Sequence, residues 1–257
     1  MPGSIRRDEL AAYLEVYLDA ARDRDYGPNG IQVEGREEIR RVITAVSACE
    51  ELSQRARELA ADAILVHHGL YWDGAPALLK GLMLRRVRPL IAGEISLFAY
   101  HLPLDRHGEL GNNILAAKAF GLEEIRSFAP HRGLEIGFRG KFPQPTSIGE
   151  LALRCAEIYG QQPLVLGPGE AGRKVSSLGI VSGGAQRDFY AAIDAGCDAY
   201  ITGEVSEWVT NVAREAGVHY LAAGHYATER LGIRALGEHL AEKFGLEVTF
   251  VDLPNPV

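Results

Sequence analysis

The sequence predicts an α/β protein made of two related halves, each with a mixed sheet. Short apolar runs of strand character alternate with amphipathic helical segments, which is the pattern of βαβ units. A strand–helix–strand pattern over 42–68 is followed by a second over 178–204, and the two align without a gap at an offset of 136 residues. We therefore expect halves at 1–127 and 128–257, and keep open that the C-terminal helix and strand pack back on the first.

The composition is that of an ordinary globular protein and argues against several classes. Of 257 residues, 47% are apolar and 24% are charged, and the formal net charge of −7 makes a nucleic-acid partner unexpected. We expect no membrane association, because no apolar run approaches the roughly 20 residues that span a bilayer. Residues 1–10 are charged and lack the apolar core of a signal peptide, so we expect a cytoplasmic protein. The cysteines at 49, 155 and 197 are expected to be free thiols.

The elements of the first half follow from apolar periodicity. The expected helices are 5–21, 50–60, 78–92 and 112–120. The expected strands are 42–46, 61–68 and 95–100, and the turn-rich segment 26–35 leads into another short strand. Helix 78–92 carries four cationic side chains on one face, which we interpret as a solvated face, with phosphate steering as the alternative.

The second half opens with a segment, 128–177, that we interpret as an α+β linker element. It contains an alternating strand at 136–142, a capping box at Ser147 and Glu150 that opens a helix to about 159, a strand at 163–166 and a glycine-rich turn at 167–172. The repeat then supplies strands at 178–182, 197–204 and 219–223. A helix at 226–244 and a strand at 247–251 complete the expected elements.

Histidines and carboxylates gather where predicted strands end. His67 and His68 close the strand 61–68, and Gly69 is expected to turn the backbone so that both imidazoles reach one site. A His-x-x-x-Asp pair at 101 and 105 is echoed, 124 residues later, by a His-x-x-x-Glu pair at 225 and 229. Because ligands bind at strand ends of α/β sheets, we expect a metal site at this rim between the halves. Its expected ligands are His67, His68, Asp105, His225 and Glu229.

Nitrogen and oxygen ligands without thiolates suit Zn, Mn, Fe, Co or Ni. Five ligands exceed the needs of one tetrahedral ion, which favours two divalent ions sharing Asp105 or Glu229. His107, His131 and His239 are interpreted as surface residues and His219 as a satisfied core histidine. The segment 182–184 is either an anion-binding or a tight turn, and Thr202 and Glu204 are expected to contact substrate or support the ligands.

Seven motifs, in this order, make the chain resemble the Nif-three-like family, the dinuclear-metal-centre, hexameric proteins often labelled homologues of GTP cyclohydrolase one, type two. They are NGIQVEG at 29–35, HHG at 67–69 with Trp72, HLPLD at 101–105, GNN at 111–113, SGG at 182–184, TGE at 202–204 and GHYATE at 224–229. The resemblance implies a two-domain α/β subunit, a toroidal homohexamer built as a trimer of dimers, and two metal ions on the five ligands named above. His101 lies beside the implied site.

The first functional hypothesis is a metal-dependent hydrolase that acts on a nucleotide or another small molecule. His101 and Glu204 are the candidate proton carriers. The family label suggests cyclohydrolase chemistry, and phosphoester or amide hydrolysis fits the residues equally well. The alternative is a non-enzymatic metal-binding ring that acts as chaperone, metal-delivery or interaction protein. A third hypothesis, a ring that encircles DNA, predicts salt-dependent affinity and is disfavoured by the acidic composition.

Overall fold

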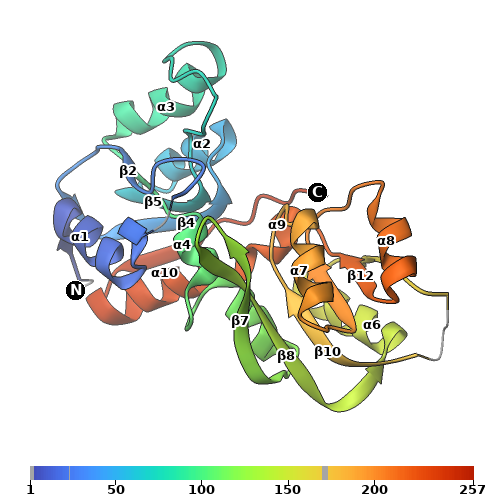
Figure 1. Ribbon diagram of the computed structural model, residues 1–257. Coiled ribbons are helices and arrows are strands. Elements are labelled where there is room, and N and C mark those ends of the chain that lie inside the picture. The colour runs from blue at the N-terminus through green and yellow to red at the C-terminus, as the bar shows by residue number, and fades with distance from the viewer. Residues whose placement is uncertain (1–2, 23, 170–172) are drawn as a thin grey trace. The chain divides into compact units, whose positions relative to one another are not determined.

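A computed structural model of the chain describes residues 3–22, 24–169 and 173–257, and it divides into two compact units (Figure 1). The first unit comprises Met1–Leu104 and Ile233–Leu253, and the second Asp105–Gly232 and Pro254–Val257. The structure thus places the division between Leu104 and Asp105 instead of after residue 127. The reason is that the helix at 112–119 and the strand that begins at 123 are part of the second unit. The C-terminal helix and strand return to the first unit, whose sheet the strand extends.

The first unit is built on a five-stranded sheet in the order β13-β4-β5-β6-β2. Its strands are β13 (Glu247–Phe250), β4 (Arg41–Ser47), β5 (Ala63–His68), β6 (Ser96–Ala99) and β2 (Gly30–Val33). The first four are parallel to their neighbours, and β2 pairs antiparallel with β6. A two-stranded ladder of β1 (Ile5–Arg6) and β3 (Glu38–Ile39) lies outside this sheet. The sheet is therefore mixed, as the sequence predicts.

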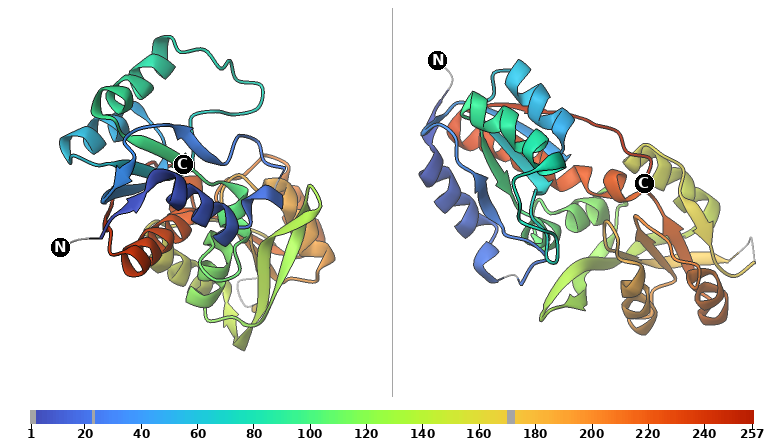
Figure 2. Two further views of the ribbon diagram at one scale, coloured as in Figure 1. Left: turned by 90° about the vertical axis from the view of Figure 1, so that its left-hand side faces the viewer. Right: turned by 90° about the horizontal axis from the view of Figure 1, so that it is seen from above.

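Helices cover both faces of the first sheet, as Figures 1 and 2 show. The helices of one face are α2 (Glu50–Glu58) and α3 (Gly81–Gly93), and those of the other are α1 (Arg7–Tyr17) and α10 (Arg230–Phe244). Leu52, Ala56 and Leu90 pack with Ile64 and Val66 in the core under α2 and α3. Burial of aliphatic side chains at about 25 cal/mol per Å² stabilises this layer and fixes the position of β5, which carries two candidate ligands.

His239 lies in the packed layer of α1 and α10 and is not a surface residue, which corrects the sequence interpretation. Its ring stacks on Tyr17 with centroids 4.4 Å apart, and its Nε2 lies 2.5 Å from the hydroxyl of Tyr13. The periodicity of α10 alone could not reveal this role, since both aromatic partners come from a helix more than 200 residues earlier.

The second unit contains a six-stranded sheet in the order β7-β8-β10-β11-β12-β9. The strands are β7 (Glu123–His131), β8 (Leu134–Ser147), β10 (Lys174–Ile180), β11 (Ala199–Thr202), β12 (His219–Ala222) and β9 (Leu164–Leu166). β10, β11 and β12 are parallel, and antiparallel strands flank them on both sides. The expected linker element is thus part of this sheet, and its long β7–β8 hairpin was predicted only in part. Residues 170–172 of the expected glycine-rich turn lie outside the described residues.

Two layers of helices enclose the second sheet (Figure 2). One layer contains α5 (Asn112–Ala119) and α6 (Ile148–Tyr159), and the other α7 (Phe189–Asp194) and α8 (Val209–Ala216). The predicted capping box opens α6, where the Ser147 hydroxyl accepts from the Glu150 N–H and the Glu150 carboxylate accepts from the Ser147 N–H. Short segments complete the chain: α4 (Leu102–Arg106), α9 (His225–Thr228) and two 3₁₀ turns at Ala20–Arg22 and Gln186–Asp188.

The strand pairing carries the internal repeat that the sequence predicts. In the first sheet, Val42 of β4 pairs with Ala63 of β5, and in the second, Leu178 of β10 pairs with Ala199 of β11. Both members of the second pair lie 136 residues after those of the first, so the two parallel ladders share one register. Equivalent positions at the ends of these strands can therefore be compared directly.

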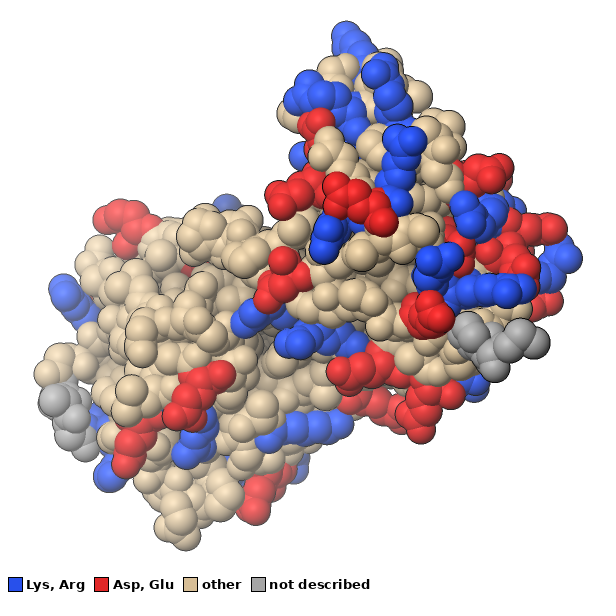
Figure 3. Space-filling model, turned by 180° about the vertical axis from the view of Figure 1, so that it is seen from behind, with Lys and Arg blue, Asp and Glu red and all other residues tan. Residues whose placement is uncertain are grey.

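The surface charges and the cysteines of the described residues can be examined directly. No helix of the described segments is long and apolar enough to cross a membrane. Lys and Arg side chains gather over α3 in Figure 3, where Lys80, Arg85 and Arg88 are exposed and Arg85 pairs with Glu50 at 2.8 Å. All three cysteines are free thiols, and burial raises the pKa of Cys155 to about 12.

Candidate metal-binding residues

Three imidazoles of the first unit converge at the end of β5. His67 and His68 are the last two residues of that strand, and His101 follows β6. One ring nitrogen of each lies within 4.8 Å of the others, and the ring centroids of His67 and His68 are 4.7 Å apart. His67 is completely buried. Three imidazole nitrogens at this spacing form a group that could hold a divalent ion.

Backbone and hydroxyl groups orient the two strand-end imidazoles. The Nδ1 of His67 lies 3.2 Å from the carbonyl oxygen of Tyr100, and the Nδ1 of His68 lies 2.9 Å from the hydroxyl of Ser47. Because a carbonyl can only accept, the hydrogen bond of His67 requires a proton on Nδ1, and in the neutral ring the lone pair is then on Nε2. This is the tautomer that a metal ligand needs.

Gly69 has a different role from the turn that the sequence analysis expected. Its φ does not lie in the left-handed region, and β5 continues as strand through His68. A Cβ at position 69 would instead lie 2.3 Å from the Gln32 amide, which accepts the Leu70 N–H at 2.7 Å. A side chain at position 69 would therefore displace the Gln32 amide from the Leu70 N–H, and the prediction that the strand ends before both histidines was wrong.

Asp25 is a functional candidate that the sequence analysis missed. Its side chain is 2% exposed, and its Oδ1 lies 2.6 Å from the Nδ1 of His101. It also accepts from the N–H groups of Tyr26 and Leu102 and from the Asn29 amide. Burial alone would raise the pKa of Asp25, but the hydrogen bond and charge of His101, with the Asn29 and Tyr26 donors, lower it to about 2. The carboxylate thus holds the His101 ring with Nδ1 directed toward it.

The Trp72 side chain packs beside this group of histidines. The Trp72 ring meets His101 edge-on at a centroid distance of 5.1 Å and lies 5.6 Å from His68. A cavity of about 10 Å³, the size of one water molecule, is lined by His67, His101 and Trp72, among others. The first unit therefore has a small space beside its imidazoles.

In the second unit, Asp105 lies in α4 and is held by three neutral side chains. Its Oδ1 accepts from the Asn112 amide and the Ser182 hydroxyl, each at 2.9 Å. Asn113 bridges the Asp105 carbonyl and the Ser182 N–H. Of the two alternatives for 182–184, this geometry favours a tight turn over a site for a bound anion, because the Ser182 hydroxyl donates to the protein's own Asp105 carboxylate.

His225 begins the short helix α9, and Glu229 follows its last residue. The His225 Nε2 lies 3.2 Å from Glu229 Oε1, so the four-residue spacing places both side chains together as predicted. A carboxylate oxygen of Glu229 also lies within 4.8 Å of one from Asp105, and these carboxyls are 2% and 5% exposed. Gly183 allows the Glu229 carboxylate to lie against the backbone, because a Cβ at position 183 would be 2.2 Å from Glu229 Oε1. Its φ of +69° also favours glycine.

Glu204 contacts one of the candidate ligands of the second unit, His225. Its Oε1 lies 2.6 Å from the Nδ1 of His225, and its Oε2 accepts from Gln186 at 2.8 Å. Burial alone would lower the pKa of His225, but Glu229 and Glu204 raise it to about 9. Thr202 acts locally, where its hydroxyl donates to the Gly183 carbonyl at 3.0 Å.

His219 differs from the satisfied core histidine that the sequence suggests. The residue is buried, as expected, but its Nε2 has no hydrogen-bond partner among the described residues. Burial and the charge of Arg173 lower the pKa of His219, so its ring is held neutral. Its position in β12 was predicted correctly, but the missing partner could not be read from sequence.

A family profile matches nearly the whole chain. The profile of Duf34/NIF3 (NGG1p interacting factor 3) aligns with residues 5–256. The chain belongs to this family. The resemblance identified from the seven motifs is thereby confirmed, and the α/β fold class agrees with that of NIF3 proteins of known structure.

Curated NIF3 relatives are similar over their whole length. A protein of Vibrio cholerae named GTP cyclohydrolase 1 type 2 homolog is 44% identical over 249 residues, covering 97% of this chain and 98% of that protein. A Pseudomonas aeruginosa protein of the same name is also 44% identical, over 98% of this chain and 99% of its own. Both relatives are thus named as homologues of GTP cyclohydrolase.

Solved structures of similar proteins have the same fold. The protein ybgI, of unknown function, is 40% identical with a TM-score of 0.92 and covers 98% of this chain and 100% of its own. The protein TTHA1606 from Thermus thermophilus is 37% identical with a TM-score of 0.86 and the same coverage. This NIF3 protein therefore shares its fold with both solved structures over nearly its whole length.

Proposed function

We propose that this NIF3 protein binds two divalent metal ions through His67, His68, Asp105, His225 and Glu229 and acts as a metal-dependent hydrolase on a nucleotide or another small molecule. The observation that carries the proposal is the construction of each unit: buried and half-buried candidate ligands meet there and are held by further hydrogen bonds. Such support is typical of metal ligands, whose outer partners fix the tautomer and the orientation of the ring.

The donor set fits the proposed ions. Two buried carboxylates within 4.8 Å of each other repel, and a cation at their oxygens would offset that repulsion. Imidazole nitrogen and carboxylate oxygen together suit Zn, Mn, Fe, Co and Ni. When bound, such a pair of ions lowers the pKa of a water molecule and polarises the bond that is cleaved.

The chain's own groups divide between orientation and proton transfer. Asp25 fixes the Nδ1 side of His101, which suits that ring to carry a proton near the other imidazoles. Glu204 is engaged by His225 and Gln186, which favours an orienting role for it. The geometry therefore supports His101 over Glu204 as the proton carrier.

Metal content tests the first part of the proposal. The purified full chain, reconstituted with Zn²⁺ or Mn²⁺, is expected to retain two ions by elemental analysis. His68→Ala is expected to reduce this content, whereas His131→Ala, an imidazole outside the ligand set, is expected to leave it unchanged. Reconstituted protein without bound metal, or equal metal content in both variants, would overturn the proposal.

Substrate turnover tests the second part. The name of the relatives suggests release of formate from GTP, and metal-dependent formate production by the reconstituted protein is the result that would support cyclohydrolase chemistry. If no first-row metal gives formate, a panel of phosphoesters and amides tests hydrolysis more broadly.

A metal-binding homohexamer without catalysis remains the alternative, because the donor set alone does not require turnover. It predicts loosely held metal, no activity on that panel, and a stable partner in affinity purification. The trimer-of-dimers ring is itself a proposal, tested by light scattering of the purified protein. Salt-dependent DNA binding would instead support the encirclement hypothesis.

A further inference from the structure

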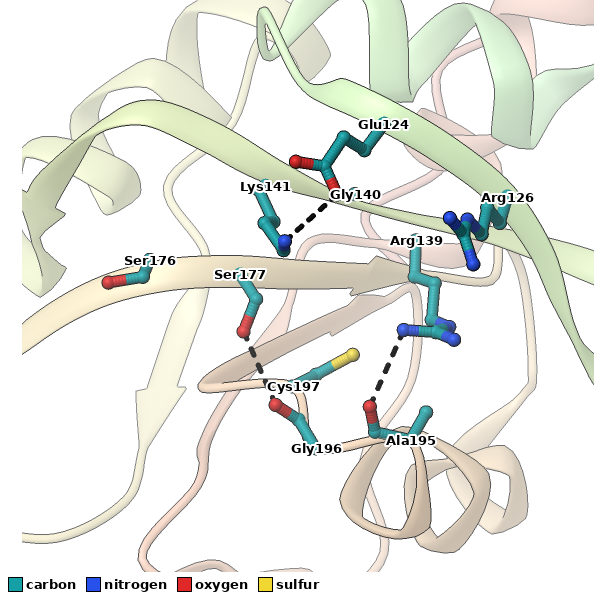
Figure 4. Close-up of a pocket in the computed structure, with 10 residues that line it drawn as sticks. All are labelled: Glu124, Arg126, Arg139, Gly140, Lys141, Ser176, Ser177, Ala195, Gly196 and Cys197. Atoms are coloured by element: carbon teal, nitrogen blue, oxygen red, sulfur yellow. Dashed lines mark hydrogen bonds and ion pairs between the residues drawn. The ribbon is translucent and has the colours of Figure 1, made fainter.

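The second unit contains a cavity that none of the candidate ligands lines. It has a volume of about 370 Å³ and is bounded by β7, β8, the start of β10 and the loop between α7 and β11 (Figure 4). Small-molecule sites in proteins typically have volumes of about 300–1,000 Å³. The cavity is therefore large enough for a small metabolite.

This cavity lies at the opposite end of the parallel strands from the candidate metal ligands of the same unit. Ser176 and Ser177 line it near the beginning of β10, whereas Ser182, which holds Asp105, follows the end of that strand. Ser182 lies five residues after Ser177 along β10 and the two residues that follow it, which corresponds to about 16 Å of extended chain. The cavity is thus a separate place in the fold, away from the strand ends where catalysis is proposed.

Three cationic side chains line the cavity from two neighbouring strands. Arg139 and Lys141 alternate along β8 and so share a face, and Arg126 of β7 is the register partner of Arg139. Like charges directly opposite in a ladder are destabilising. Figure 4 shows both guanidinium groups on the cavity side of the hairpin.

Carboxylates neutralise only one of these cations. Lys141 pairs with Glu124 at 2.8 Å, but neither Arg126 nor Arg139 has a carboxylate within 4.0 Å in the described part of the chain. Arg139 donates only a long hydrogen bond, 3.5 Å, to the Ala195 carbonyl. Two guanidinium groups are thus held together with no carboxylate in direct contact among the described residues, and Glu124 attracts Arg126 only from beyond 4.0 Å.

The backbone is distorted where it brings these groups together. The β7–β8 ladder shifts register between Glu123 and Arg126, and Glu124 has a φ of +50°, which is unfavourable for a residue with a Cβ. Such bulges redirect side chains, and here the bulge brings Arg126 into register with Arg139. Strain of this kind persists where the surrounding structure needs it.

The remaining lining groups suit binding and not covalent chemistry. Ser176 and Ser177 lie at the rim, where the Asp198 carboxylate accepts from both N–H groups and from the Ser177 hydroxyl. The Ser176 hydroxyl is therefore the serine donor that a ligand could use. Burial raises the pKa of the Cys197 thiol to about 11, so this cysteine is neutral and not nucleophilic near pH 7. The cavity therefore offers cations and hydroxyls but no reactive group.

We propose that this cavity, the arginine pocket, is a second ligand site that binds the phosphate group of a small metabolite between Arg126 and Arg139, with Lys141 and the two serines completing its polar lining. Planar guanidinium groups bind phosphate oxygens in pairs, which suits two adjacent arginines that no carboxylate contacts in the described part of the chain. The proposal concerns a site apart from the metal ligands and does not depend on the proposed hydrolase activity.

Calorimetric titration of the purified full chain with inorganic phosphate, AMP and adenosine tests the proposal. Phosphate and AMP are expected to bind and adenosine is not, and AMP binding tighter than phosphate indicates that the organic part is also recognised. Arg139→Gln and Arg126→Gln are each expected to weaken binding about tenfold or more, because a charge-assisted hydrogen bond is lost. The matched control Arg214→Gln removes an exposed arginine of α8 and is expected to have no effect.

Glu124→Gln provides a test in the opposite direction. This variant removes the partner of Lys141 and is expected to tighten phosphate binding several-fold, a change that partial unfolding would not produce. Absence of saturable binding of either phosphate compound would overturn the proposal. Equal affinities of the Arg139→Gln and Arg214→Gln variants, or unchanged affinity in Glu124→Gln when an arginine variant fails to fold, would overturn it as well.

Discussion

The repeated strand ends of the two units use the same position for different tasks. His67 and His68 end β5 and are candidate ligands themselves, whereas the equivalent residues after β11, at the same offset of 136, are Gly203 and Glu204. Glu204 contacts the Nδ1 of His225 and so orients a candidate ligand instead of being one. One architectural position thus supplies ligands in one copy and ligand support in the other.

The two groups also differ in charge. The first unit gathers three imidazoles, of which His101 is held by Asp25, and the second gathers Asp105 and Glu229 with one imidazole. Neutral nitrogen donors are inexpensive to bury, whereas a buried carboxylate is costly without a cation or hydrogen bonds. We therefore expect the second unit to dominate metal affinity. The first two predictions compare the units, and the last two concern the second unit alone.

The largest effect is expected from removing a carboxylate of the second unit. Glu229→Gln deletes a negative charge and an oxygen ligand, and should lower Zn²⁺ or Mn²⁺ affinity by more than the roughly 10- to 100-fold typical of losing a supporting partner. His67→Ala should cost less, because it removes a neutral donor. Calorimetric titration measures both, with the exposed Glu215→Gln as control, and an equal or larger loss in His67→Ala would contradict the comparison.

The next largest effect is expected from the two carboxylates that orient histidines, Glu204 and Asp25, whose variants should differ from each other. Glu204→Gln is expected to lower metal affinity about 10- to 100-fold, because it loosens His225. Asp25→Asn is expected to change metal affinity less and kcat more, since it acts on the proposed proton carrier His101. If both variants change metal affinity equally, His101 is a ligand like His225.

Metal binding should depend on pH through His225. Its pKa of about 9 means that a metal ion must displace a proton below that pH, so affinity should fall about tenfold for each unit of pH below 9. In the metal-free protein the sign for stability is opposite: the raised pKa stabilises the fold fully below pH 6.5, and this stabilisation is lost as pH rises through 9. Chelator competition from pH 6 to 9 measures the first effect, and a flat profile would contradict it.

The smallest expected effect concerns the glycine beside Glu229. Gly183→Ala and Gly121→Ala both place a Cβ at a φ near +70°, which costs about 1–2 kcal/mol. Only position 183 also meets Glu229, at 2.2 Å, whereas nothing lies within 4 Å of a Cβ at position 121. Thermal unfolding and metal titration should therefore show a larger loss of both stability and metal affinity in Gly183→Ala, and equal losses would exclude the contact as the cause.

The sequence by itself determined most elements, the repeat and the family. Local periodicity predicted β5, α2 and the capping box of α6, since these depend on neighbouring residues. The candidate ligands were recognisable because imidazoles and carboxylates are conspicuous at strand ends. The five-ligand set itself stays a prediction.

Only the tertiary structure decided which groups support those ligands. Asp25 and His101 are 76 residues apart, Glu204 and His225 are 21 apart, and neither spacing has a local signature. Gly69 was misinterpreted for the same reason, because the side chain nearest to it, Gln32, comes from another strand. Strand β13 pairs with β4 because the C-terminal segment runs back to the first unit. The boundary of the units therefore could not be located from the apolar pattern of neighbouring residues. Pairing across long loops is fixed by packing and hydrogen bonding in three dimensions, which a linear pattern does not encode.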